Sequence, residues 1–206
     1  MEKLTKLSSI AAPMMRINID TDQIIPARFL VRTSDEGLGE GLFAGSRYNK
    51  DGSLNPDFIL NRAPYSKAEI LLADRNFGCG SSREGAPVAL RQFGFRAVIA
   101  PSFGGIFFNN CFRNGIVPIE MPIEDVRKIV AEIEATQGQG RVTVDLEQQL
   151  VTAPGGASFK FRSPPLMREM LLAGADEVAL TLKRGAAITS FRSADSKRRP
   201  WAYRPS

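Results

Sequence analysis

The sequence predicts an α/β fold whose mixed, partly parallel sheet is flanked by helices. Strand and helix patterns alternate through the middle of the chain, which indicates parallel strands joined by right-handed crossovers. An amphipathic helix follows, and two later segments alternate apolar and polar residues as strands do. The expected strands are 9–16, 70–73, 97–100, 116–121, 141–146 and 157–161, and the expected helices are 83–93, 101–113, 123–136, 164–173 and 176–191.

The central elements follow from their apolar runs and from the residues that break them. The runs at 70–73 and 97–100 are continuously apolar, as expected for buried strands. Pro87 is expected in the first turn of the helix at 83–93, where proline is tolerated. Gly115 ends the next helix and separates it from the third strand of the series.

The first strand and the surrounding loops complete the prediction. The strand at 9–16 runs into a polar turn that contains Asp20 and Asp22. Residues 33–55 are rich in Gly, Asp, Ser and Asn and are expected to form a long surface loop, a kind of segment that is often functional. A Pro-Gly-Gly turn at 154–156 is expected to join the two late strands.

The chain is long enough for one domain with a hydrophobic core. It has 206 residues, of which 43% are hydrophobic and 24% are charged. A chain of this size buries about 70% of its extended surface on folding. We expect a single domain over residues 1–192, whereas residues 193–206 are polar and basic and are expected to form a poorly ordered tail.

The cysteine and histidine counts exclude several kinds of chemistry. The chain has two cysteines, Cys79 and Cys111, and no histidine. Two thiols without imidazoles cannot build the usual zinc sites or hold a cubane cluster unaided. A catalytic triad that depends on histidine is excluded. We therefore expect no metal to be bound by this chain alone.

Hydropathy and charge bear on location and partners. No apolar run approaches the ~20 residues that span a bilayer, and the first residues lack the apolar core of a signal peptide. We therefore expect a reducing cytoplasm and no membrane contact. The net charge of +5 fits a small anionic substrate or an acidic protein partner as well as a merely basic surface. Without a recognised motif, nucleic-acid binding is not expected.

Residues 76–84, Asn-Phe-Gly-Cys-Gly-Ser-Ser-Arg-Glu, form the candidate functional segment. They lie between a predicted buried strand and a predicted helix, where open α/β sheets place their ligand sites. Gly78 and Gly80 permit tight turns and the close approach of a ligand. Backbone N–H groups at a helix start attract a carboxylate, and Arg83 adds a two-pronged donor for one.

A purely structural role fits the same residues. Ser81 and Glu84 have the S-x-x-E spacing of a capping box, so the serines could serve only to cap the helix. Arg83 could form a surface ion pair. The spacing is not that of a dinucleotide-binding fingerprint, because Arg83 is found where the third glycine is needed.

The segment resembles the signature of isopropylmalate dehydratase small subunits, which are relatives of the mobile swivel domain of aconitase. The resemblance extends over nearly the whole chain, up to about residue 191. It includes motifs at 20–26, 55–58, 98–103 and 144–146, in the order and spacing of the family. It implies an aconitase-like, swivelling β/β/α domain and an activity that interconverts 2-isopropylmalate and 3-isopropylmalate by dehydration and rehydration in leucine biosynthesis.

The resemblance also implies a partner and roles for the loop residues. In this family a separate large subunit carries a [4Fe–4S] cluster, and the two subunits form a heterodimer or heterotetramer that acts on a small dicarboxylate. By resemblance, Ser81 is the catalytic base, acting as an alkoxide, and Ser82 and Arg83 bind a substrate carboxylate. The residues expected to support the loop are Gly78, Cys79, Gly80, Glu84, Asp20 and Asp22.

Two departures from the family pattern leave alternatives open. Gly85 is found where most relatives have histidine, and Asp35 and Glu36 occupy positions where relatives often have a basic residue. The chain is therefore expected to be an ordinary small subunit, a paralogous small subunit for another hydroxy-dicarboxylate such as methylmalate, or a non-catalytic swivel-domain binding protein.

Overall fold

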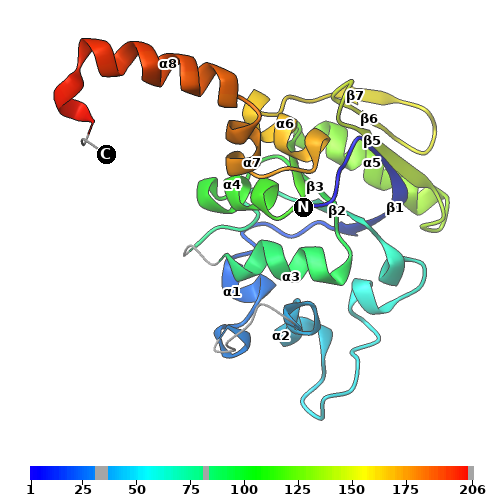
Figure 1. The fold of residues 1–206 in the computed structure, drawn as a ribbon. Coiled ribbons are helices and arrows are strands. Elements are labelled where there is room, and N and C mark those ends of the chain that lie inside the picture. Colours follow the sequence, from blue (N-terminus) through cyan, green and yellow to red (C-terminus); the bar gives the residue numbers. More distant parts are fainter. Residues whose placement is uncertain (31–36, 81–83, 204–206) are drawn as a thin grey trace.

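One curled sheet of seven strands organises the computed structural model, which describes residues 1–30, 37–80 and 84–203 (Figure 1). The strand order is β4-β3-β2-β1-β5-β6-β7, and this mixed α/β architecture confirms the predicted fold class. The strands are β1 (Lys6–Met14), β2 (Ile70–Ala73), β3 (Ala97–Ala100), β4 (Val117–Glu120), β5 (Arg141–Asp145), β6 (Leu150–Thr152) and β7 (Ser158–Lys160).

Helices flank this sheet and connect its strands. The α-helices are α1 (Thr21–Ile24), α2 (Ala44–Arg47), α3 (Gly85–Phe93), α4 (Gly105–Arg113), α5 (Ile123–Ala135), α6 (Pro165–Ala173), α7 (Glu177–Leu182) and α8 (Gly185–Arg198). Short 3-10 helices lie at Ala27–Phe29, Leu38–Gly41, Ile59–Asn61, Tyr65–Lys67 and Pro200–Ala202. Among the described residues, no helix combines the length and apolar character needed to span a membrane.

Strands β1 to β4 run parallel, and the alternation of strands and helices predicted this for β2, β3 and β4. Ala11 pairs with Ile70, Ile70 with Ala97, and Ala97 with Val117. All four strands therefore end at the same edge of the sheet. The loops that follow β1, β2 and β3 are neighbours at this edge, which is where sheets of this kind place ligand sites.

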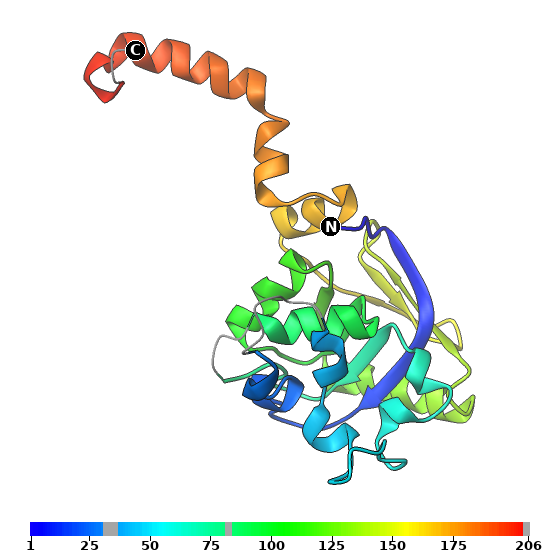
Figure 2. The same ribbon diagram turned by 60° about the horizontal axis from the view of Figure 1, so that its bottom comes forward.

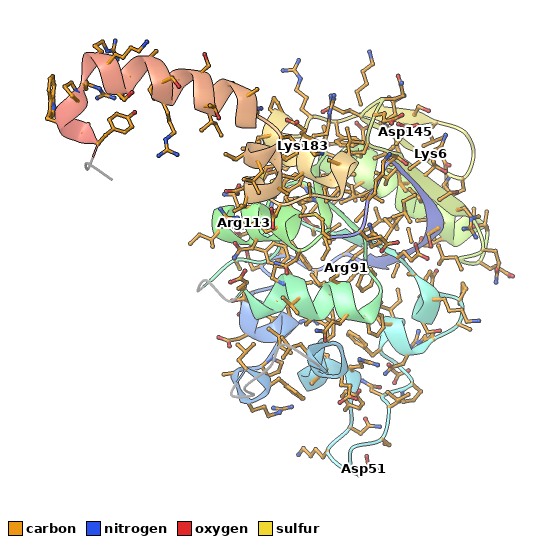
Figure 3. The ribbon with its side chains drawn as sticks, viewed as in Figure 1. Lys6, Asp51, Arg91, Arg113, Asp145 and Lys183 are labelled. Atoms are coloured by element: carbon orange, nitrogen blue, oxygen red, sulfur yellow. The ribbon has the colours of Figure 1, made fainter. Side chains whose placement is uncertain are left out.

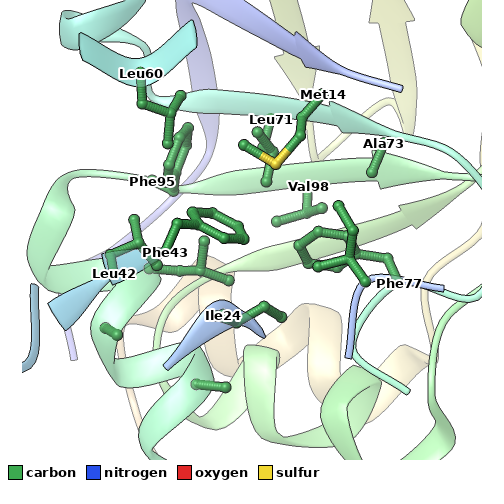
Figure 4. Packing of buried hydrophobic residues seen from close by; sticks show 14 of the residues in the cluster. Met14, Ile24, Leu42, Phe43, Leu60, Leu71, Ala73, Phe77, Phe95 and Val98 are labelled. Atoms are coloured by element: carbon green, nitrogen blue, oxygen red, sulfur yellow. The ribbon is translucent and has the colours of Figure 1, made fainter. Parts of the chain in front are cut away.

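Both faces of the parallel half are buried. On one face Leu71 packs in a cluster with side chains of α1 and α3 (Figure 4). On the other face Leu72 packs in a cluster with side chains of α5. Helix α4 contributes to both clusters, with Phe107 in the first and Phe112 in the second. This double burial explains why β2 and β3 have continuously apolar sequences.

The other half of the sheet is antiparallel. Strand β1 pairs with β5, Lys6 lies opposite Asp145, and their charged groups are 3.6 Å apart (Figure 3). The predicted hairpin between 141–146 and 157–161 was wrong in one respect, because β6 lies between these two strands. The turn at 154–156 joins β6 to β7 instead. Strand β6 has only three residues, too few to show an alternating pattern.

The prediction of a surface loop over 33–55 was wrong for its middle part. Leu38, Leu42 and Phe43 are at most 4% exposed and belong to the main hydrophobic cluster. Gly39 and Gly41 lie between Leu38 and the Leu42-Phe43 pair, so the apolar residues show no helical or strand period. Residues 31–36, which include Asp35 and Glu36, lie outside the described residues.

The C-terminal region differs from the expected tail. The helical stretch predicted at 176–191 is divided into α7 and α8, and α8 continues past residue 192 to Arg198. Its last turn is held by Asp195, whose carboxylate accepts hydrogen bonds from Arg199 at 2.6 and 2.8 Å and from the Tyr203 hydroxyl at 3.0 Å. The bonds from Arg199 keep the pKa of Asp195 below its ordinary value. Residues 193–203 thus have local order that their polar composition did not predict.

Candidate active site

The loop after β2 lies between the loops after β1 and β3. On one side, the Gly78 N–H donates to the Ile19 carbonyl at 2.7 Å, and the Cys79 carbonyl accepts from the Thr21 N–H at 3.0 Å. On the other side, the Phe77 N–H donates to the Ser102 carbonyl at 3.0 Å, and its carbonyl accepts from Gly104 at 2.9 Å. The loop therefore extends the parallel sheet beyond β2, and its backbone is fixed from both sides.

Gly78 is required by both its backbone and its surroundings. Its φ of +70° lies in the left-handed region that favours glycine. A Cβ atom at this position would lie 2.2 Å from the ring of Phe107. Gly104 is similarly confined, because a Cβ there would lie 2.3 Å from the Gly78 carbonyl oxygen. These two glycines let neighbouring loops approach each other and the aromatic side chain below them.

An aromatic cluster supports the loop from beneath. Phe77 is fully buried, and its ring centroid lies 5.4 Å from that of Phe107 and 6.3 Å from that of Phe103 in edge-to-face geometry. Such pairs add to the stability gained from burial itself. The described part of the loop thus has an apolar base.

Asn18 and Ser102, which the sequence analysis did not select, position the start of the loop. Asn76 has a φ of +62°, and its side-chain amide donates to the side-chain oxygen of Asn18 at 2.8 Å. The Ser102 hydroxyl accepts from the Asn76 N–H at 2.9 Å. Asn18 and Ser102 both follow the carboxyl end of a parallel strand, which is the sequence signal that could have indicated them.

Asp20 and Asp22 lie beside this loop. Asp20 is the N-cap of α1, and its carboxylate accepts from the Gln23 N–H at 2.7 Å. Gly80 has a φ of +94°, and a Cβ atom built there would lie 3.5 Å from the Cβ atom of Asp20. Asp22 is exposed in the first turn of α1. The structure therefore places Asp20 beside Cys79 and Gly80, and its role in supporting the loop stays a prediction.

The three residues with the most specific predicted roles, Ser81, Ser82 and Arg83, lie outside the described residues. Glu84, which follows them, is exposed and is the N-cap residue of α3 without a side-chain capping bond. The capping-box prediction was therefore wrong, because that motif places Glu84 at the third helical position. Helix α3 begins at Gly85, three residues later than a capping box with Glu84 at its third helical position would place it.

The space beside Gly85 is filled by a leucine from another segment. A Cβ atom at Gly85 would lie 2.3 Å from the Cδ2 methyl of Leu30. Leu30 therefore occupies the space beside the first residue of α3, where most relatives were expected to have histidine. A larger side chain at Gly85 would need the Leu30 methyl groups to move.

Replacing Asp20 by alanine tests the support of the loop. Loss of the N-cap bond is expected to lower the free energy of unfolding by about 1 kcal/mol and to reduce turnover of the assembled enzyme, because Asp20 adjoins Gly80. Asp176→Ala is the matched control, since Asp176 caps α7 with an equal bond of 2.7 Å to the Ala179 N–H. Chemical denaturation and kcat at saturating partner are the measurements. Equal kcat for the two variants would exclude a special role for Asp20.

The two thiols differ in environment. Cys79 is half-buried in the loop, whereas Cys111 is fully buried in α4. Burial raises the pKa of the Cys111 thiol well above its ordinary value. No group of three or more His, Cys, Asp or Glu side chains that could hold a metal ion is found in the parts of the chain that the structure describes. The donor atoms of this chain do not fit an iron–sulfur cluster, which needs several thiolates.

This difference predicts selective alkylation. In the native protein iodoacetamide is expected to modify Cys79 and to leave Cys111 unmodified up to about pH 9, because the buried thiol remains protonated and inaccessible. In urea both should react. Peptide mass spectrometry after timed labelling measures the two rates, with Cys79→Ser as the control. Equal rates in the native protein would contradict the burial of Cys111.

Comparison with known proteins defines the class to which this fold and loop belong. Residues 1–124 match the aconitase C-terminal domain family, and residues 127–162 match the family described as LeuD_N. A crystal structure of 3-isopropylmalate dehydratase from Methanocaldococcus jannaschii is similar with a TM-score of 0.63 and 28% identity, over 91% of this chain and 99% of that one.

More similar curated relatives specify the family further. The 3-isopropylmalate dehydratase small subunit of Gluconacetobacter diazotrophicus is 53% identical over 99% of this chain and 98% of its own length. That of Rhizobium meliloti is 50% identical over 98% of this chain and 100% of its own length. The chain therefore belongs to the 3-isopropylmalate dehydratase small-subunit family. This confirms the resemblance and the hydro-lyase class that it implied.

Proposed function

We propose that the chain is the catalytic-loop subunit of a 3-isopropylmalate dehydratase, which interconverts 2-isopropylmalate and 3-isopropylmalate in leucine biosynthesis. One observation supports this most strongly. The backbone of residues 76–80 is fixed at the carboxyl edge of the parallel sheet, immediately before Ser81, Ser82 and Arg83. This fixed backbone ends one residue before Ser81, at the edge where sheets of this kind place ligand sites.

The proposed chemistry of this chain is proton removal and carboxylate binding. Ser81 acts as the base that takes the proton from the carbon next to a carboxylate. A serine hydroxyl is a weak base unless nearby positive charge and N–H donors stabilise its ionised form. Arg83 supplies a permanent positive charge, and with Ser82 it binds and orients the substrate carboxylate.

The iron–sulfur cluster is assigned to a separate large subunit. Two thiols, one of them buried in the core, are too few to hold it in this chain. We infer a heterodimer or heterotetramer in which the large subunit meets the carboxyl edge of the parallel sheet, so that the cluster and this loop face a shared small dicarboxylate. The cytoplasm is the expected compartment for an enzyme with free thiols and a cluster.

A second candidate function is turnover of a different hydroxy-dicarboxylate, such as methylmalate. The specific observation in its favour is the Leu30 methyl group beside Gly85, which gives an apolar surface at the start of α3, where the resemblance implied histidine. A hydrophobic group changes preference among substrate side chains by about 1–3 kcal/mol per methylene. A non-catalytic binding role has no observation of this kind in its favour.

The experiment is anaerobic co-purification with the cognate large subunit, followed by absorbance measurement of the unsaturated product from isopropylmalate and from methylmalate. A stable complex with higher kcat/KM for isopropylmalate is expected. A complex that prefers methylmalate would replace the first candidate by the second. A complex that turns over neither substrate would leave only the binding role.

A further inference from the structure

The C-terminal arm, defined here as α7, α8 and the 3-10 helix that follows (residues 177–202), extends away from the body of the protein. Figures 1 and 2 show α8 projecting from the body in both views. Every residue from 181 to 194 is exposed. An isolated helix of this length is marginally stable in water, because helices gain most of their stability from packing. The arm therefore presents a helix without the packing that normally stabilises one.

The arm is attached firmly at its base. Leu180 of α7 is 4% exposed, and Glu177 forms an ion pair with Arg113 of α4 at 3.3 Å. Arg113 and Lys183 mark this junction in Figure 3. These contacts join α7 to the body of the protein. In Figure 1 the arm projects toward the side of the body where α1 and α4 lie, and α1 adjoins the candidate loop.

Large apolar side chains are exposed along the arm. Val178 is 66% exposed, Leu182 70%, Phe191 60% and Trp201 80%. Val178 and Leu182 are four residues apart and line one shallow hollow of about 310 Å³ on α7. Val178 and Leu182 therefore form one exposed apolar patch on α7, and such patches mark interaction sites. Aromatic and arginine side chains are the types that contribute most to protein interfaces.

The arm also holds most of the excess positive charge of the protein. It contains six Lys and Arg side chains and two acidic ones, so it accounts for four of the five net positive charges of the chain. Both acidic groups are paired, Glu177 with Arg113 and Asp195 with Arg198 and Arg199. Two copies of so basic a surface repel each other, which disfavours an arm-to-arm dimer. An acidic surface with an apolar hollow is the complementary partner.

We propose that the C-terminal arm is a docking element for the large subunit, and that it binds an acidic, partly apolar groove on that subunit at a distance from the catalytic loop. This proposal rests on the proposed function, which supplies the partner. It assigns two attachments to one partner, the carboxyl edge of the sheet and the arm. Two linked attachments bind far more tightly than either alone.

The test compares two arm variants in the full chain, the apolar pair Leu182→Ser/Phe191→Ser and the charge pair Arg192→Glu/Lys197→Glu. The control is Leu54→Ser/Lys50→Glu, in which Leu54 is also exposed, at 53%, near the labelled Asp51 and far from the arm (Figure 3). The dissociation constant for the large subunit is measured by interferometry at several salt concentrations. Circular dichroism checks that each variant remains folded.

Both arm variants are expected to raise the dissociation constant at least tenfold, to leave kcat at saturating large subunit within twofold, and in the charge pair to weaken the salt dependence. The control should stay within twofold of the unmodified chain.

In one outcome the unmodified chain binds the large subunit and supports turnover, while both arm variants bind that subunit equally well. In that case the docking proposal is overturned and the proposed function stands. If the unmodified chain neither binds nor supports turnover, the proposed function fails and the docking proposal with it. A third outcome would also overturn the proposal, in favour of a nucleic acid. In it the unmodified chain binds single-stranded RNA in a salt-sensitive way, only the arm variants lose this binding, and binding of the large subunit is unchanged.

Discussion

Replacing Gly78 by alanine is expected to lower the free energy of unfolding by about 2–5 kcal/mol. The left-handed backbone costs a non-glycine residue about 1–2 kcal/mol, and forcing a methyl group against a packed ring costs about 1–3 kcal/mol more. The ring is that of Phe107, which would lie 2.2 Å from the new Cβ atom. For a chain of this size the melting temperature should fall by roughly 5–15 °C. Turnover should also fall, because the loop must move to relieve the contact.

Gly52→Ala separates the two contributions. Gly52 also has a positive φ, of +84°, but no atom lies within 4 Å of a Cβ built there. This variant should lose only the backbone part, about 1–2 kcal/mol. Combining Gly78→Ala with Phe107→Ala should remove the steric part, so the two changes should be strongly non-additive. Equal melting temperatures for Gly78→Ala and Gly52→Ala would show that the loop does not pack on Phe107 as described.

Replacing Ser81 by alanine is expected to lower kcat of the reconstituted enzyme by about 10²- to 10⁴-fold, the usual contribution of a general base. Substrate binding should change much less, because Ser82 and Arg83 are proposed to hold the carboxylate. Subunit association should also persist, since the substitution removes one hydroxyl. Steady-state kinetics and gel filtration of the complex measure the two quantities.

Ser66→Ala is the control for this experiment, because Ser66 is an exposed serine in a short 3-10 helix. It should leave kcat within twofold. If Ser81→Ala retained activity within a few fold of the unmodified enzyme, Ser81 could not be the base, and another group would have to remove the proton. A loss of association would instead indicate a structural role for the hydroxyl.

The parallel half of the sheet was predictable because its signals are local. Apolar runs at β2 and β3, with Pro87 and Gly115 limiting the helices between them, specify strands and helices without reference to the rest of the fold. The location of the functional segment also followed, since the residues after β2 must lie at the carboxyl edge. The hydrogen-bond partners of residues 76–80 at this edge could not be predicted, because they belong to the loops after β1 and β3, which are distant in sequence.

The parts that were missed depend on long-range contacts. The apolar residues Leu38, Leu42 and Phe43 have no period, so only their packing in the main cluster identifies them as core. Strand β6 exists because its neighbours pair with it on both sides. Helix α8 continues past residue 192, where Asp195 accepts hydrogen bonds from Arg199 and from the Tyr203 hydroxyl. The polar composition of this segment alone predicted a solvated tail.

The most direct test of the two-subunit enzyme is an anaerobic titration of the purified large subunit with this chain, followed by product absorbance and by iron analysis of each separated subunit. We predict that the large subunit alone is inactive and holds all of the iron. Activity on isopropylmalate should then rise with added chain and reach a plateau. Iron bound to this chain, or turnover by the large subunit that does not depend on it, would contradict the assignment.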